Sequence, residues 1–133
     1  MRDQTSNGRV DWARTKTVLL ETRKRNGEWV ATPVSLVVDD DGRAFFRTYD
    51  AAGKAKRLRN FPEVRVTPCT LRGRTTGPAV PASTRLVTGP EAEHARALLA
   101  RRYPVLHGKL VPWTHRRKGW TTLHYELALG EQD

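Results

Sequence analysis

The sequence lacks disulfide-forming pairs of cysteine and any long apolar run. Its 133 residues include a single cysteine, Cys69, which excludes an internal disulfide and fits a reducing compartment. No segment approaches the roughly 20 consecutive apolar residues that a membrane helix requires. The first residues, M-R-D-Q-T-S-N-G, carry charge with no apolar run behind them, unlike a secretory signal. We therefore expect a cytoplasmic protein that does not insert into a membrane.

Patterns that identify metal, nucleotide or acid–base sites are also missing. The single cysteine and the four histidines are not spaced as metal ligands are. They are Cys69, His94, His107, His115 and His124. The chain has neither a G-x-G-x-x-G sequence nor a Walker loop. Glu91 and Glu93 lie two apart on a predicted helix and face different ways, so they are not a carboxylate pair. We predict no metal site and can name no catalytic residue.

Acidic residues are outnumbered, because 24 Lys and Arg against 14 Asp and Glu give a net charge of +10. Such a surface attracts nucleic acid, anionic lipid and nucleotide-like cofactors. Four cations follow Gly53 with no acid among them: Lys54, Lys56, Arg57 and Arg59. A charge run of this kind is commonly a solvated surface. Here the run lies between two predicted strands and begins a predicted helix. The unpaired N–H groups at the start of that helix and the four cations together predict a phosphate site.

Apolar alternation predicts about six strands and one long helix. Strands are expected at residues 16–25, 28–38, 44–49, 63–70, 80–88 and 120–129, a short basic helix at 54–60, and a longer helix from Pro90 to Tyr103. Asn26-Gly27 predicts a two-residue hairpin, and Pro33 and Pro68 indicate edge or irregular positions. For residues 105–119 we expect short helical turns at most.

Hairpin connections dominate this pattern, so we expect a mainly β protein whose antiparallel sheet closes into a small barrel. Residues 1–15 are predicted to be an N-terminal arm, with Trp12 able to anchor its end. Residues 16–130 then form one domain.

Several short motifs resemble one family. They are A-T-P-V-S at 31–35, the basic turn G-K-A-K-R-L-R-N-F-P at 53–62, V-T-P-C-T at 66–70, and the run from Tyr103 through H-G-K-L-V-P. Together with the order of elements, they resemble the pyridoxamine-phosphate-oxidase-like (PPOX-like) split-barrel proteins. Within that superfamily they are most similar to the branch that binds the deazaflavin coenzyme F420. Ala52 departs from the pattern, since family members often have serine or threonine before the Gly-Lys pair.

The resemblance implies a homodimeric, six-stranded split β-barrel of the FMN-binding type, with the cofactor in a groove between subunits. It implies an F420-dependent oxidoreductase that transfers a hydride between the deazaflavin and a small organic acceptor, with FMN as the alternative cofactor. The cofactor-binding residues carried over are Thr32, Pro33, Val34, Arg47, Thr48, Gly53, Lys54, Lys56, Arg57 and Arg59. Lys54 and Arg57 are expected to hold the phosphate, with Lys56 and Arg59 as weaker candidates.

Other functions stay open on the sequence alone. The same fold could serve an FMN-binding oxidoreductase or a non-catalytic carrier of F420 or flavin. A basic barrel that binds nucleic acid is the disfavoured alternative, because the cations cluster in one turn and one late segment. A longer anionic ligand such as F420 could also use Arg72, Arg74 and the basic residues 116–118.

Overall fold

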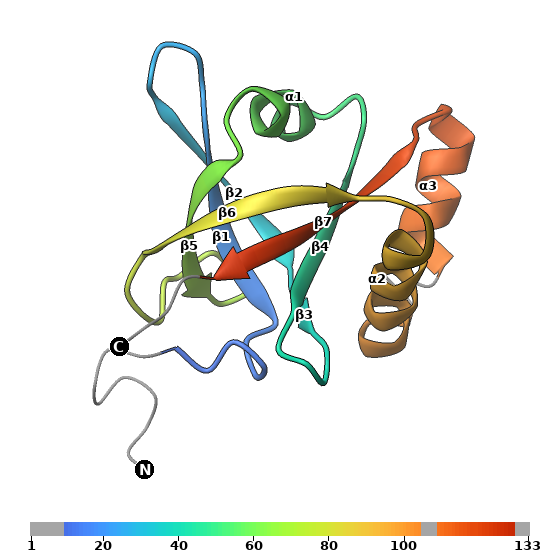
Figure 1. The fold of residues 1–133 in the computed structure, drawn as a ribbon, viewed down its shortest axis with the longest axis horizontal. Coiled ribbons are helices and arrows are strands. Elements are labelled where there is room, and N and C mark those ends of the chain that lie inside the picture. The colour runs from blue at the N-terminus through green and yellow to red at the C-terminus, as the bar shows by residue number, and fades with distance from the viewer. Residues whose placement is uncertain (1–9, 105–108, 130–133) are drawn as a thin grey trace.

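A seven-stranded antiparallel sheet curls around one apolar core in the computed structural model, which describes residues 10–104 and 109–129 (Figure 1). The strands are β1 (Thr17–Arg23), β2 (Trp29–Ser35), β3 (Val37–Val38), β4 (Ala44–Tyr49), β5 (Glu63–Cys69), β6 (Val80–Val87) and β7 (Thr122–Leu129). The helices are α1 (Gly53–Asn60), α2 (Gly89–Arg102) and α3 (Val111–Lys118). The strand order is β2-β1-β5-β6-β7-β4-β3. The expected mainly β, antiparallel fold is confirmed.

The expectation of six strands was wrong, because the single strand predicted at 28–38 is two strands. β2 pairs with β1, whereas β3 pairs with β4 at the other end of the sheet. The change of partner occurs at Leu36, which is fully buried and whose backbone N–H donates to the Lys16 carbonyl at 2.8 Å. The apolar alternation continues through this residue, so the sequence pattern does not reveal the change.

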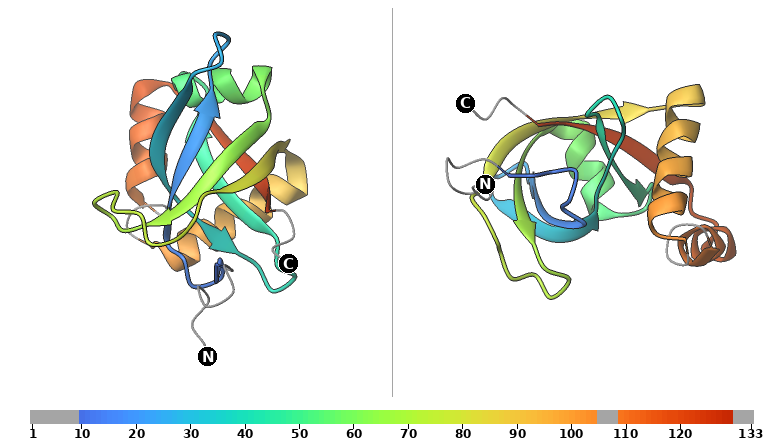
Figure 2. Two further views of the ribbon diagram at one scale, coloured as in Figure 1. Left: turned by 90° about the vertical axis from the view of Figure 1, so that its left-hand side faces the viewer. Right: turned by 90° about the horizontal axis from the view of Figure 1, so that it is seen from below.

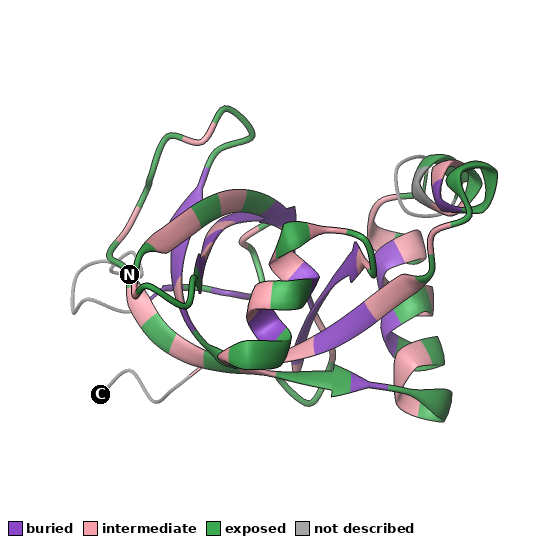
Figure 3. Ribbon diagram, turned by 90° about the horizontal axis from the view of Figure 1, so that it is seen from above, coloured by how far each residue is buried: buried purple, intermediate pink, exposed green. Residues whose placement is uncertain are grey.

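The concave face of the sheet holds the main core. Val18, Leu20 and Val66 are fully buried there, and Phe46 stacks on Tyr125 with ring centroids 5.3 Å apart. Seen from above, α1 lies across one opening of the curled sheet (Figure 3). It closes that end by burying two apolar side chains, Ala55 and Leu58, at helical spacing. The helix that carries the basic residues is thus fixed at one open end of the curled sheet, which does not close into the complete barrel expected, because its end strands β2 and β3 are not paired with each other.

The other two helices lie together on the outer side of the sheet (Figure 2). Ala95 and Leu99 of α2 pack against Val37 and Phe45. α3 is a helix of eight residues, longer than the short turns expected for this region. Its proline lies in the first turn, where the missing N–H costs no helical hydrogen bond. Residues 105–108, including part of the H-G-K-L-V-P run, lie outside the described residues.

Local signals in the sequence correspond to observed turns. The Asn26-Gly27 hairpin forms, with the Lys24 N–H donating to the Glu28 carbonyl at 2.8 Å and Gly27 at φ 91°. Pro33 lies on edge strand β2, and Pro68 lies beyond the segment of β5 that pairs with β6. Trp12 is buried in the core, whereas residues 1–9 of the predicted arm lie outside the described residues. None of the described helices has the length and apolar character needed to cross a membrane.

Candidate anion-binding site

The N-terminus of α1 follows closely on the end of β4. The Ala52 N–H donates to the Tyr49 carbonyl at 3.0 Å, and helical conformation begins at Gly53. Ala52 has the extended backbone of a capping residue but no side chain that can cap, and the first turn contains no acidic residue. The partial positive charge of the helix N-terminus is therefore not offset by a side chain of its own first turn.

Lys54, in the first turn of α1, is a partly buried cation. Burial, together with the nearby charge of Arg57, lowers the pKa of Lys54 from 10.5 to about 8. Removing an ammonium group from water beside a second cation disfavours its charged form. The free protein therefore holds Lys54 in an environment that an anion would improve.

Arg57 is held one turn later by a hydroxyl group from another strand. Its Nε donates to Thr22 Oγ1 of β1 at 2.6 Å, which fixes the guanidinium beside the helix N-terminus. A Cβ added at Gly53 would lie 2.8 Å from Arg57 Nη1. A side chain at this position would therefore displace the end of the Arg57 side chain, and a left-handed backbone is not the reason for glycine here, since the φ of Gly53 is not positive.

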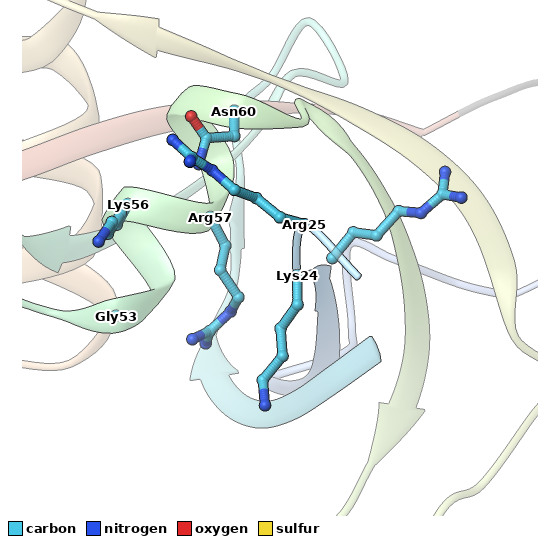
Figure 4. Close-up of a pocket in the computed structure, with 7 residues that line it drawn as sticks. Lys24, Arg25, Gly53, Lys56, Arg57 and Asn60 are labelled. Atoms are coloured by element: carbon cyan, nitrogen blue, oxygen red, sulfur yellow. The ribbon is translucent and has the colours of Figure 1, made fainter. Parts of the chain in front are cut away.

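A depression of about 270 Å³ opens between α1 and the β1–β2 hairpin (Figure 4). The described residues that line it are Arg23, Lys24, Arg25, Gly53, Lys56, Arg57 and Asn60. Five of these seven are cations and none is an acid. We call this the basic depression.

Two of the hairpin cations already have partners. Lys24 Nζ lies 3.7 Å from Glu28 Oε1, in a pair whose side chains are both more than half exposed. The Arg23 guanidinium lies over the rings of Trp29 and Phe61, 5.6 and 5.8 Å from their centroids. An exposed ion pair of this kind contributes little stability, so Lys24 can exchange its partner easily.

The sequence did not identify the hairpin cations or Asn60 as site residues. The R-K-R run at 23–25 falls within the strand predicted at residues 16–25, immediately before the Asn26-Gly27 turn. Its position opposite α1 depends on the curl of the sheet. The only signal in the sequence was the run of three cations itself.

The predicted basic residues are partly brought together. Gly53, Lys56 and Arg57 line the basic depression. Lys54 lies close enough to Arg57 for their charges to repel. Arg59 is exposed and does not line the depression.

The predicted residues of β2 differ in their environments. Thr32 lies opposite Leu20 of β1, and its buried Oγ1 has no hydrogen-bond partner in the described structure. Val34 packs in the core, whereas Pro33 between them is exposed. Thr32 therefore offers an unused buried hydroxyl on the core-facing side of the strand.

Arg47 and Thr48 point to opposite faces of β4, as neighbouring strand residues must. Thr48 is buried and shares the core-facing side with Phe46. Arg47 is buried on the other side, where desolvation and the charge of Arg96 on α2 lower its pKa to about 10. The structure does not bring the Arg47 side chain to the basic depression.

Two buried histidines accompany Arg47 on that outer face. Burial, with Arg47 and Arg96 nearby, lowers the pKa of His124 to about 4. Its Nε2 has no hydrogen-bond partner among the described residues. His115 Nδ1 lies 2.5 Å from Thr122 Oγ1, and burial lowers its pKa as well. Both histidines are therefore neutral packing groups at neutral pH.

Comparison with known proteins gives structural matches without a sequence family. No protein-family model matches the chain, and no curated protein matches its sequence. The heme storage protein HutZ from Vibrio cholerae matches with a TM-score of 0.69 and 15% identity, over 90% of this chain and 84% of HutZ. An FAD-binding protein from Mesorhizobium loti matches with a TM-score of 0.58 and 12% identity, over 90% of this chain and 82% of its own.

A candidate pyridoxamine 5'-phosphate oxidase from Listeria innocua also matches, with a TM-score of 0.54 and 11% identity, over 87% of this chain and 85% of its own. Two further matched structures are longer, and this chain covers 50% and 48% of their lengths. At these identities the likeness establishes the fold. The expected split-barrel architecture is therefore confirmed.

Proposed function

We propose that this protein is an F420-dependent oxidoreductase that acts as a homodimer and transfers a hydride between the deazaflavin and a small organic acceptor. The observation that carries the proposal is Lys54. It is a partly buried cation beside a second cation, at a helix N-terminus whose own first turn offers no opposing charge. This arrangement is unfavourable in the free protein and becomes favourable when an anion binds.

The residues present fit a phosphate-bearing cofactor. Lys54 and Arg57 hold the phosphate, and Gly53 leaves room for the guanidinium beside it. Thr32 contributes through its place on edge strand β2, because its Oγ1 is buried on the core-facing side of the strand. Lys56 adds charge at the lining of the depression, and Arg59 adds charge at longer range.

The remaining predicted residues act through the backbone in this proposal. β2 is an edge strand, so the groups on its outer edge, around Pro33 and Val34, are open to a ligand. Arg47 and Thr48 stand at the end of β4, just before α1, where the backbone can approach the ring. When bound, the deazaflavin supplies the hydride chemistry itself, while the chain binds and orients it and excludes water.

The number of cations favours F420 over FMN. A single terminal phosphate, as in FMN, can be neutralised by Lys54, Arg57 and the helix N-terminus. F420 adds carboxylates to its internal phosphodiester, and the basic depression offers five cations. The fold shared with an FAD-binding protein keeps a flavin as the alternative cofactor.

Binding measurements test this proposal directly. Purified protein is titrated with F420, FMN and labelled single-stranded DNA at physiological salt, with tryptophan fluorescence as the signal. We expect F420 to bind most tightly. A preference for DNA over both cofactors would overturn the proposal.

Two double variants locate the site. The Lys54→Ala/Arg57→Ala variant should weaken F420 binding by at least about 100-fold, because each of the two charge-assisted contacts contributes about 1.5–3 kcal/mol. The matched control is Arg14→Ala/Arg101→Ala, which removes two exposed cations, one before β1 and one on α2, that have no assigned role in the site. Equal affinity in both variants would remove Lys54 and Arg57 from the site.

Two further measurements test catalytic turnover and the oligomeric state. Reduced F420 mixed with a quinone or enone should be oxidised in the steady state by the wild-type protein. Tight binding without turnover would instead show a carrier. Sedimentation equilibrium should give twice the mass of one chain.

A further inference from the structure

Helix α3 has an outward side on which two large apolar side chains remain exposed. Leu110 and Trp113 are 51% and 53% exposed, whereas such side chains are usually buried. The backbone of Leu110 is already helical, with φ −67° and ψ −50°, so the two residues lie three apart on one side of the same helix. One exposed apolar residue is ordinary, but a neighbouring pair forms a small surface patch.

The inward side of α3 holds the helix in place. His115 is the buried residue among the described positions of α3, and its ring centroid lies 5.3 Å from that of Tyr49 and 5.9 Å from that of Trp120. Its Nδ1 is also 2.5 Å from Thr122 Oγ1. Figures 1 and 3 show α3 at the margin of the molecule, beside α2. The helix is thus held through one side, and its outward side can meet a partner.

The chain around α3 carries positive charge without any acid. The stretch between Glu93 and Glu126 contains seven Lys and Arg and no Asp or Glu. Three of the seven occupy the last turn of α3 and are exposed: Arg116, Arg117 and Lys118. Cations in a last turn stabilise the helix C-terminus, but that role does not require an exposed tryptophan beside them. Here the Arg117 guanidinium lies over the Trp113 ring, 5.7 Å from its centroid. We call Leu110, Trp113 and these three cations the α3 face.

We propose that the α3 face docks on the surface of a lipid bilayer that contains anionic lipids. Tryptophan and leucine beside exposed cations are typical of helices that lie in the plane of a membrane interface. The indole ring suits the level of the headgroups, and the cations are attracted to negatively charged lipids. In this arrangement α3 lies on the bilayer and does not cross it, which none of the described helices is long and apolar enough to do. The proposal does not rest on the proposed function.

Two other occupants of the α3 face are less favourable. A second copy that met this face through a two-fold axis would place the three cations of one chain against the same cations of the other, with no acid in the face to offset their repulsion. Single-stranded nucleic acid binds by stacking its bases on open aromatic rings, whereas Arg117 already covers the Trp113 ring. A bilayer surface needs neither an acid nor an open ring on the protein.

Co-sedimentation of the full chain with vesicles, without cofactor, tests the proposal. We expect wild type to bind vesicles of phosphatidylcholine mixed with phosphatidylserine, and to bind pure phosphatidylcholine vesicles much more weakly. Added salt should weaken the binding, because it screens the attraction between the cations and the headgroups. Two double variants, Leu110→Ala/Trp113→Ala and Arg116→Ala/Arg117→Ala, should each bind the mixed vesicles at least about tenfold more weakly than wild type.

Matched controls come from the β5–β6 loop, which lies on the side of the molecule away from α3 (Figures 1 and 2). Leu71→Ala removes a leucine that is 87% exposed, and Arg72→Ala/Arg74→Ala removes two exposed cations. Both controls should bind the mixed vesicles within about twofold of wild type, because charges more than a Debye length from the bilayer contribute little. Circular dichroism verifies that every variant is folded.

A fluorescence measurement tests whether Trp113 reaches the bilayer. The other three of the four tryptophans are buried or half-buried. Lipids brominated on their acyl chains quench an indole that reaches them, so mixed vesicles made with these lipids should lower the fluorescence of wild type. Trp113→Phe keeps an apolar ring, so this variant should still bind the vesicles but should lose most of the quenching.

The results that would overturn the proposal are distinct from one another. No binding of wild type to the mixed vesicles, or equal weakening in the α3 variants and the loop controls, would show that the α3 face does not dock on lipid. Loss of self-association in the α3 variants, with vesicle binding unchanged, would assign the face to a second copy. Loss of single-stranded DNA binding, with vesicle binding unchanged, would assign it to nucleic acid. Each of these results leaves the proposed cofactor site standing, because vesicle binding is measured without F420.

Discussion

Replacing Lys54 by methionine should stabilise the free protein while weakening anion binding. Methionine has a similar length and no charge, so it can keep the packing of the lysine stem. A pKa lowered from 10.5 to about 8 means that the fold disfavours the charged lysine by roughly 3 kcal/mol, at about 1.4 kcal/mol per pH unit. Part of this cost is relieved by solvent, so we expect a gain of about 1–3 kcal/mol in the free energy of unfolding at pH 7.

The pH dependence of this gain identifies its cause. Because the folded pKa of Lys54 lies below the unfolded one, the unfolded chain binds more protons between pH 8 and 10.5. The stability of wild type therefore rises relative to the variant across that window. The advantage of Lys54→Met should be full below pH 8 and should shrink toward zero near pH 10.5.

Urea denaturation at pH 7 and pH 10 measures both quantities. The control is Lys56→Met on the exposed side of the same helix, which should change stability little at either pH. The reasoning about Lys54 fails if Lys54→Met is less stable than wild type at pH 7. It also fails if the advantage is the same at both pH values.

Three further outcomes follow from the structure. Gly53→Ala should change the free energy of unfolding by less than about 1 kcal/mol, because the gain in helix propensity offsets the loss of the displaced Arg57–Thr22 contact. The affinity of this variant for F420, measured by titration, should fall. Unchanged affinity would show that the position of the Arg57 guanidinium does not affect binding. Wild type should lose up to about 3 kcal/mol as pH falls from 6.5 to 4, because the unfolded chain protonates His124 before the folded one does. Urea denaturation of His124→Leu should show a smaller loss, and an identical pH profile would contradict the assignment. Leu20→Ala, which empties part of the core, should cost about 2–5 kcal/mol by thermal or urea unfolding, whereas a cost under 1 kcal/mol would place Leu20 outside the core.

The regular elements follow from local signals in the sequence. Alternation predicts β4 at its observed bounds, and the Asn26-Gly27 pair predicts the first hairpin, because strand pleat and turn geometry act over a few residues. At Leu36 the local sequence pattern no longer predicts the structure. Its apolar character suits one long strand, yet the chain there leaves one end of the sheet for the other.

The site could be predicted only in part, because sequence patterns report on neighbouring residues and not on contacts between distant ones. The cations of α1 are consecutive, so their common position could be predicted from the chain itself. Arg57 is fixed by Thr22, 35 residues earlier, and Lys24 faces α1 only because the sheet curls. The opposite orientation of Arg47 and Thr48 follows from strand alternation alone and was available from the sequence.

Binding and folding place opposite demands on Lys54, and their pH dependences separate the two. The free protein becomes more stable as pH rises above 8, because the folded state then loses an unfavourable buried charge. An anion at the helix N-terminus favours the charged form, so it raises the pKa of Lys54 and its own affinity falls over the same pH range. A lysine that only filled space would show the first effect without the second. Stability that rises while affinity falls above pH 8 is therefore the signature of a cation kept at this position for a ligand.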